Sequence, residues 1–199
     1  ALAAGDAISD LLIEMKEKAL AASDVSLDSA SRTALDEDFK AMRDQISTIV
    51  ENAEFNGTNL IDGSSSGGIS ALANAKGTNT ISVADEDMSL SGTILGLSSG
   101  TDIATQTDAA AAVTAIDSAL TNLNSALSRL GTGSKSLEIH KTFVSKLSDS
   151  LEKGIGNLVD ADLAKESARL QSLQVKQQLG IQALSIANSA PSTVLGFFR

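Results

Sequence analysis

The chain has 199 residues, of which 42% are hydrophobic, but it has no Trp, Tyr or Cys and only five Phe. The lack of Cys excludes disulfides and thiolate–metal sites, and a formal net charge of −10 argues against binding to nucleic acid or to an anionic membrane surface. A chain of small and aliphatic side chains without bulky aromatics is typical of close helix–helix packing.

Two amphipathic helices are predicted before residue 54. Apolar residues at alternating four- and three-residue steps form one stripe over residues 1–22 and another over residues 29–53. The first stripe comprises Ile8, Leu12, Met15, Ala19 and Ala22, and the second comprises Leu35, Phe39, Met42, Ile46, Ile49 and Ala53. A polar break separates the two helices, and Asn56-Gly57 is a strong turn signal after the second.

The middle of the chain is predicted to be loop with one short β-hairpin. Residues 62–78 are rich in Gly and Ser, which is typical of loops. Polar and apolar residues alternate over 80–83, acidic residues at 85–87 suggest a turn, and residues 88–91 are predicted to return as the second strand.

From Asp108 onward, the apolar residues follow a heptad repeat. One predicted core column comprises Val113, Leu120, Leu127 and Ile155, and the other comprises Ile116, Leu123, Leu130, Leu137, Val144, Leu151 and Leu158. As continuous helix this register spans about 69 Å, which predicts a coiled-coil rod. Gly131 and Gly133 are the positions where the helix is expected to be loosest.

The last part of the chain is predicted to be a helix with two apolar faces. Leu163, Leu170 and Leu173 lie on one face, and Ala168, Val175, Leu179 and Ile186 lie on another. No charge occurs between Lys176 and Arg199. A membrane helix, a helix docked on its own chain and a polymer core are the three interpretations. Polar Gln and Asn side chains argue against the first, and packing of identical tails explains the lack of charge.

Catalytic and metal-binding patterns do not assemble in this sequence. His140 is the single histidine, and the acidic run at 85–87 lacks the spacing of a calcium-binding loop. No phosphate-binding loop is present, because no G-K-[ST] follows the glycines of the loop. We therefore expect no catalytic, cofactor-binding or metal-binding residue, no cofactor, and no enzymatic activity.

Three segments resemble motifs of bacterial flagellins. Residues 54–61 (EFNGTNLI) resemble the F-N-G-x-x-L-L turn that closes the conserved N-terminal rod region of that family. Residues 159–166 (VDADLAKE) resemble its I-x-D-A-D-x-A-x-E stretch, and residues 183–195 resemble its closing A-x-x-x-A-N-x-x-P-x-x-V-L. The resemblance covers roughly residues 1–62 and 104–199.

The resemblance implies a mainly α fold: a long antiparallel coiled-coil-like helical rod with a small β-hairpin or loop insertion and a C-terminal helical tail. Residues 1–62 would be N-terminal rod helices, 63–103 a short variable region facing solvent, 104–153 the long C-terminal rod helix, and 154–199 an inner-tube helix. The short middle is similar to that of alphaproteobacterial flagellins, and we expect the family's first N-terminal helices to be missing from this sequence.

As a flagellin, the chain would be a structural subunit that self-assembles into the extracellular flagellar filament for motility, exported by the flagellar type III route. Its implied partners are identical or related flagellin subunits, an export chaperone, and the cap and hook-junction proteins. The alternatives are a hook–filament junction protein and a coiled-coil surface adhesin or binding module. The residues expected to pack between subunits are Leu163, Leu170, Leu173, Val175, Leu179, Ile186, Val194 and Leu195.

One further expectation concerns the Toll-like receptor that recognises some flagellins. Residues 12–18 match the position of the family's L-Q-R-V-R-E-L receptor motif, through Leu12, Glu14 and Glu17, and Asp38 matches a Glu on the next helix. Glu14 stands where the motif has its key Arg. Because this reverses a charge that the receptor would contact, the sequence predicts weak or no recognition.

Overall fold

The computed structural model describes the backbone of residues 1–65 and 67–196, and the side chains of these residues apart from 161 and 188–196. The chain forms two compact units, Ala1–Lys141 and Thr142–Arg199. The expected fold class is confirmed, because helices dominate, both strand pairs are antiparallel, and the last helix is very long.

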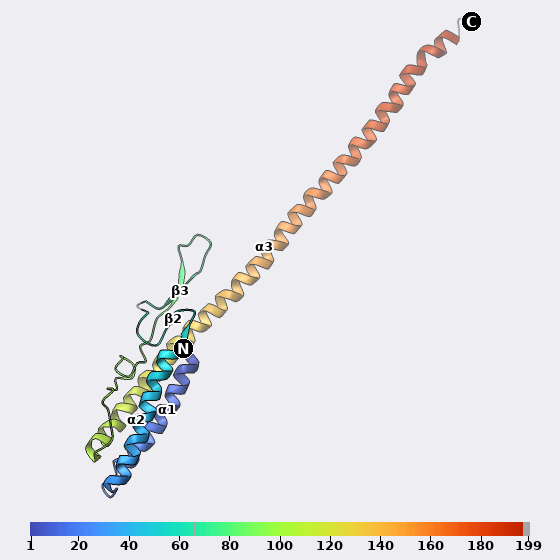
Figure 1. Ribbon diagram of the computed structural model, residues 1–199. Coiled ribbons are helices and arrows are strands. Elements are labelled where there is room, and N and C mark those ends of the chain that lie inside the picture. The colour runs from blue at the N-terminus through green and yellow to red at the C-terminus, as the bar shows by residue number, and fades with distance from the viewer. Residues whose placement is uncertain (66, 197–199) are drawn as a thin grey trace. The chain divides into compact units, whose positions relative to one another are not determined.

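The first unit begins with two helices, α1 (Leu2–Ala22) and α2 (Ser29–Asn52), which lie side by side (Figure 1). All five members of the stripe predicted for α1 are fully buried, which confirms that prediction. From the stripe predicted for α2, Phe39 and Ile46 are fully buried, while its other members are partly buried against the core.

A tight hairpin follows α2. Strand β1 (Glu54–Phe55) pairs with β2 (Thr58–Asn59), and the two residues between them have φ angles of 53° and 80°. Both positive angles belong to a type I′ turn, whose twist matches that of paired antiparallel strands. The turn predicted at Asn56-Gly57 is therefore confirmed.

The predicted hairpin over residues 80–91 is wrong in its second strand. Strand β4 (Thr80–Val83) forms as expected, but it pairs with β3 (Ile69–Leu72), which lies inside the stretch predicted to be loop. Residues 88–91 contain no strand.

Contacts with a distant segment explain why the chain does not fold back onto β4. The backbone N–H groups of Glu86 and Met88 donate hydrogen bonds of 2.9 and 2.8 Å to the carbonyls of Leu60 and Ile61. The side chains of Met88 and Ile61 are both fully buried. Burial of these two side chains therefore fixes the path of the chain after β4.

The segment that leads to the last helix is also packed against the core. Its buried apolar side chains are Leu90, Ile94, Leu95, Leu97 and Ile103. Although the resemblance implies a solvent-facing region at 63–103, much of its second half is therefore interior.

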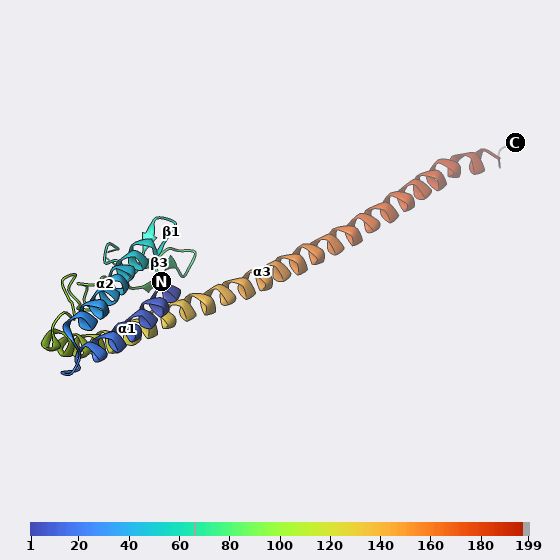
Figure 2. The ribbon, with the colours of Figure 1, turned by 60° about the horizontal axis from the view of Figure 1, so that its bottom comes forward.

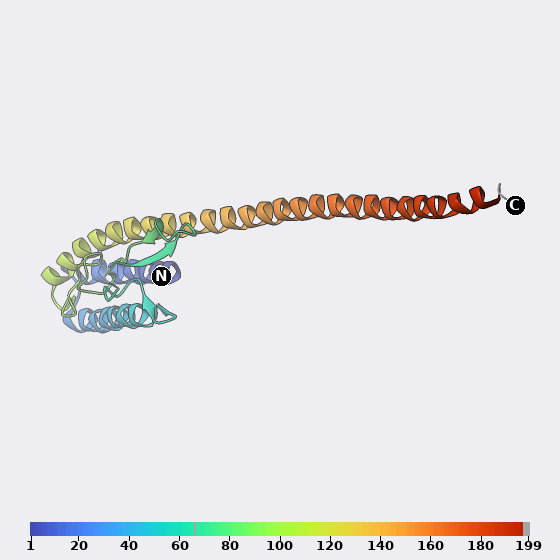
Figure 3. The ribbon, with the colours of Figure 1, turned by 90° about the horizontal axis from the view of Figure 1, so that it is seen from above.

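Helix α3 (Gln106–Gly196) begins in the first unit, where it lies alongside α1 (Figures 2 and 3). Its buried residues there are Ala109, Ala112, Ile116, Ala119, Leu123, Ala126 and Leu130. The column predicted through Ile116 is thus confirmed up to Leu130, but alanines replace the column predicted through Val113.

Gly5 of α1 leaves room for one large side chain of α3, because a Cβ atom there would overlap the Leu127 side chain. The buried alanines of α3 place only a methyl group in the core. The larger side chains of Val113, Leu120 and Leu127 pack at the flank and are only partly buried.

The glycines of α3 do not interrupt the helix. It continues through Gly131 and Gly133, where loosening was expected, and through Gly154 and Gly156 in the second unit. Gly133 faces β4, and a Cβ atom there would lie 2.8 Å from both Cγ atoms of Val83.

Candidate assembly surface

In the second unit, α3 carries a long series of exposed apolar side chains. Its large apolar residues between positions 143 and 186 are 45–74% exposed. They are Phe143, Val144, Leu147, Leu151, Ile155, Leu158, Val159, Leu163, Leu170, Leu173, Val175, Leu179, Ile181, Leu184 and Ile186. Soluble monomers rarely leave contiguous apolar surface of this extent in water, so it marks an interaction site.

The residues predicted to pack between subunits lie on this surface. Leu163, Leu170, Leu173, Val175, Leu179 and Ile186 are all exposed, and all belong to the second unit. The side chains of Val194 and Leu195 lie outside the described residues. The predicted residues therefore form part of a larger series that begins at Phe143. The sequence prediction missed the start of this series because it assigned residues 104–153 to the rod helix.

The end of this surface is polar without being charged. Between 177 and 187 the side chains include Gln177, Gln178 and Gln182, but no Asp, Glu, Lys or Arg. Amide side chains can exchange hydrogen bonds with a neighbour, whereas a charge covered by a neighbour would have to be desolvated. The composition favours coverage by other helices.

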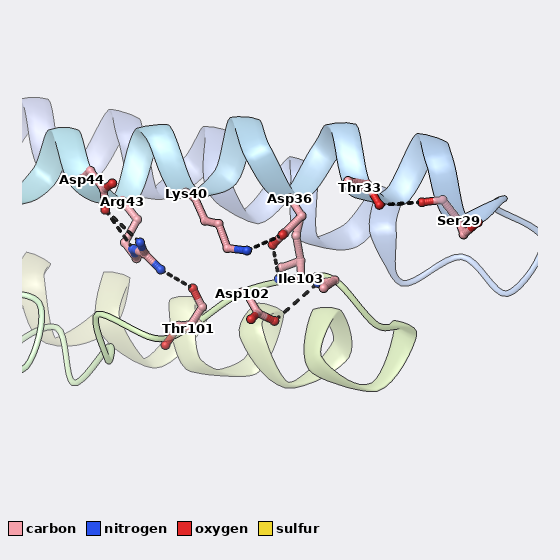
Figure 4. A network of polar contacts seen from close by, with 10 residues as sticks. Ser29, Thr33, Asp36, Lys40, Arg43, Asp44, Thr101, Asp102 and Ile103 are labelled. Carbon is pink, nitrogen blue, oxygen red and sulfur yellow. Dashed lines mark hydrogen bonds and ion pairs between the residues drawn. The ribbon is translucent and has the colours of Figure 1, made fainter.

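Polar contacts fasten the segment before α3 to α2 (Figure 4). The buried Asp36 carboxylate accepts hydrogen bonds from the backbone N–H of Ile103 at 2.8 Å and from Lys40 Nζ at 2.6 Å. Arg43 donates to the carbonyl of Thr101 at 3.0 Å. The hydrogen bond from Lys40 to Asp36 raises the pKa of Lys40. The sequence signal for this contact is an acid in an otherwise apolar helix stripe, four residues before a lysine.

An ion pair fastens the chain after β4 to α3. Both carboxylate oxygens of the buried Glu86 accept hydrogen bonds of 2.5 Å from Arg129, one from Nε and one from Nη2. This two-point contact raises the pKa of the Arg129 guanidinium. Sequence analysis placed Glu86 in a charged turn and gave no partner for it.

The positions that match the receptor motif are not equivalent in the structure. Leu12 is fully buried between the helices of the first unit, so it does not reach the surface. Glu14, Glu17 and Asp38 are exposed, and Asp38 accepts a hydrogen bond of 2.6 Å from Lys18. The surface at this place is therefore mixed in charge, and Glu14 places an acid where the motif has its key Arg.

Pockets in the first unit are shallow and lack a reactive set of side chains. One hollow of about 270 Å³ is lined by Leu2, Leu60, Ile69, Val83 and Leu130, among others, and is mostly apolar. Among the described residues, no group of three His, Asp or Glu side chains could hold a metal ion. Within the same residues, no helix combines the length and apolarity that spanning a membrane requires.

The first unit buries its apolar side chains, whereas the helix of the second unit exposes its apolar faces to water. This combination is typical of a structural protein that packs against other helices. The comparisons with known proteins agree. Residues 1–66 match the bacterial flagellin N-terminal helical region, and residues 113–198 match the bacterial flagellin C-terminal helical region. The chain belongs to the bacterial flagellin family.

Flagellins of several bacteria resemble this chain over most or all of its length, and the chain spans about 70% of the length of those relatives. It is 53% identical over 199 residues to flagellins FljM and FljO of Caulobacter vibrioides, which covers 100% of this chain and 71% of each of them. Flagellin of Brucella melitensis is 34% identical over 194 residues, covering 94% of this chain and 68% of that protein. Bacillus cereus flagellin has a similar fold, with a TM-score of 0.56 and 23% identity over 70% of this chain and 77% of that chain.

These matches confirm the family predicted from the sequence motifs, including its alphaproteobacterial character. The chain is a structural subunit of the bacterial flagellar filament, an extracellular polymer that serves motility, and it assembles with other flagellin subunits. Neither the hook–filament junction nor the adhesin alternative gains support from the comparisons.

Proposed function

We propose that the second unit makes the contacts that build the filament. Leu163, Leu170, Leu173, Val175, Leu179, Ile186, Val194 and Leu195 pack against neighbouring subunits in this proposal. The observation that carries it is the long series of exposed apolar side chains among the described residues of the second unit. In the filament, residues 1–62 and 104–153 act as the rod, 63–103 as the outer region, and 154–199 as the inner-tube helix.

Apolar burial drives the assembly. Each subunit uses different surfaces to contact different neighbours, so the contacts propagate as a helix and do not close into a ring. Covering the apolar faces releases about 25 cal/mol per Å² of buried surface. A long helix with no covering partner is only marginally stable in water, so folding of the second unit and assembly are coupled.

Other partners follow from the same exposed surface. Before assembly, a chaperone that covers the second unit keeps subunits from associating during export by the flagellar type III route. Cap and hook-junction proteins offer the matching surfaces at the two ends of the growing filament. The proposed role is structural, without catalysis or a cofactor, in keeping with the flagellin family to which the chain belongs.

A charge placed on the tail tests this proposal. Leu179→Asp or Ile186→Asp puts a carboxylate on an apolar face, so we expect filament growth to stop while the first unit stays folded. Leu179→Met, which keeps the apolar volume, is the matched control and should still polymerise. Sedimentation and electron microscopy measure growth, and circular dichroism reports folding. Normal filaments from both Asp variants would contradict the proposal.

A further inference from the structure

The turn between β1 and β2 contains the one Asn-Gly pair of the sequence. Asn56 and Gly57 are both exposed, and both have the positive φ angles that a type I′ turn requires. Apart from Gly, few residues other than Asn and Asp adopt this left-handed conformation. The turn therefore favours a residue pair that is also chemically reactive.

An asparagine side chain can react with the backbone that follows it. The backbone nitrogen of the next residue attacks the side-chain Cγ, a C–N bond forms, and the side-chain nitrogen leaves as ammonia with the proton of the attacking amide. Water then opens the five-membered ring at either of its carbonyls, which leaves an aspartate or an isoaspartate. Because the first step is intramolecular, its rate depends on how easily the two atoms meet.

Gly57 gives this reaction room at Asn56. The attacking nitrogen belongs to Gly57, which has no side chain to obstruct ring closure. Nothing lies within 4 Å of the point where a Cβ atom of Gly57 would stand. Water also reaches the turn, since both residues are exposed.

Three nearby asparagines are held differently. The side-chain amide of Asn52 donates to a carbonyl of α2 at 2.7 Å, that of Asn59 to another carbonyl of α2 at 2.7 Å, and that of Asn74 to a hydroxyl at 2.8 Å. Each of the three is followed by a residue with a side chain. Their amides are therefore fixed in place, and their attacking nitrogens are more crowded.

We propose that Asn56 is a site of spontaneous modification, at which loss of ammonia creates a new carboxylate in the exposed turn. The isoaspartate product also carries an extra carbon atom in its backbone. Because the turn has two residues and closes only two residue pairs, this atom shifts the register of β1 against β2. The site is independent of how the subunits assemble.

The register shift reaches the end of α2 through Asn59. This buried side chain anchors the hairpin, because its amide donates to the Val50 carbonyl at 2.7 Å and its oxygen accepts from the Ile61 N–H at 3.0 Å. A shift of β2 withdraws Asn59 from both partners and leaves buried polar groups unpaired. Modification at Asn56 therefore loosens the first unit.

Peptide mapping of the full chain tests the site. The protein is incubated at mildly alkaline pH and digested with trypsin, which cleaves after Arg43 and Lys76 and releases residues 44–76. Mass spectrometry locates the loss of ammonia, and an unincubated sample gives the background. We expect Asn56 to convert about ten times faster than Asn52, Asn59 or Asn74. Equal rates, or an Asn56 that stays intact, would overturn the proposal.

Two variants separate the charge from the longer backbone. Asn56→Asp carries the carboxylate on an ordinary backbone, and Asp-Gly suits a type I′ turn, so it should unfold at the same temperature as the unmodified chain. Asn56→Gly lacks the reactive amide and should give no product at this position. The isolated isoaspartate fraction should unfold at a lower temperature than both variants. Equal unfolding temperatures for all of them would contradict the register shift.

Discussion

The Glu86 carboxylate is a buried charge, and the path of the chain after β4 depends on its partner. Its side chain is only 8% exposed, whereas that of Arg129 is 56% exposed. Arg129→Ala leaves the carboxylate desolvated and without its two hydrogen bonds. We expect a loss of about 1–2 kcal/mol of unfolding free energy, less than for a fully buried pair because water screens Arg129.

Urea unfolding followed by circular dichroism measures this loss. Lys135→Ala is the control, because its pair with Glu138 is exposed on both sides and should contribute no more than about 0.5 kcal/mol. Equal effects of the two substitutions would show that Glu86 finds another partner or water when Arg129 is removed.

The cap of α2 gives a pH-dependent prediction. Asp28 accepts hydrogen bonds from the backbone N–H and the hydroxyl of Ser31, which lower the pKa of Asp28 below its ordinary value of 3.8. A carboxyl with a lowered folded pKa stabilises the fold above pH 3.8, and this contribution is lost as the pH falls through the folded value. Asp28→Asn keeps a capping side chain without the charge.

The measurement is unfolding free energy between pH 6 and pH 2. Wild type should exceed Asp28→Asn at pH 6, and the difference should shrink as the pH falls below about 3.8, the ordinary pKa of an aspartate. A difference that stays constant over this range would show that the Asp28 charge does not contribute.

The predicted weak recognition by the Toll-like flagellin receptor depends on another exposed carboxylate. Glu14 reverses the charge of the motif's key arginine, so we expect the chain to activate a cell reporter weakly or not at all. Glu14→Arg should increase the signal. Potent activation by the unaltered chain would contradict this prediction.

At the scale of elements, substitution by alanine is expected to have opposite effects on stability at two neighbouring glycines of α3. Nothing lies within 4 Å of a Cβ atom at Gly131, so Gly131→Ala should stabilise the helix by about 1 kcal/mol. A Cβ atom at Gly133 would crowd the stiff Val83 side chain, so Gly133→Ala should lose that gain or destabilise the first unit. Thermal unfolding compares the two, and equal stabilisation would contradict the packing of β4 against α3.

The helices could be predicted from the sequence because an apolar stripe is a local pattern. The strand pairing could not, since it depends on Met88 and Ile61, which are distant in sequence and meet only in the folded core. Periodicity also favoured the larger Val113 column over the alanines of α3. The structure instead buries Ala112, Ala119 and Ala126, because the face of α3 that meets the core is set by the folded unit and not by the size of its side chains.

The candidate site was predictable in part for the same reason. Two apolar faces and a stretch without charge pointed to residues such as Leu179 before any fold was known. The extension of that surface back to Phe143 was missed, because a heptad repeat looks the same whether its partner belongs to the same chain or to another.

At the scale of the whole molecule, the two units differ in how they satisfy their apolar side chains. The first unit buries a continuous core from α1, α2, the segment before α3 and the beginning of α3. The described large apolar side chains of the second unit between 143 and 186 are 45–74% exposed to water. We therefore predict that the first unit is stable in the monomer and that the second unit becomes stable only in the filament.

Hydrogen exchange measured by mass spectrometry on the monomer and on the filament tests this claim most directly. We predict strong protection of α1 and α2 in both states, and protection of the amides of residues 142–187 only in the filament. Strong protection of residues 142–187 in the monomer would contradict the account, because the apolar faces would then be covered without any other subunit.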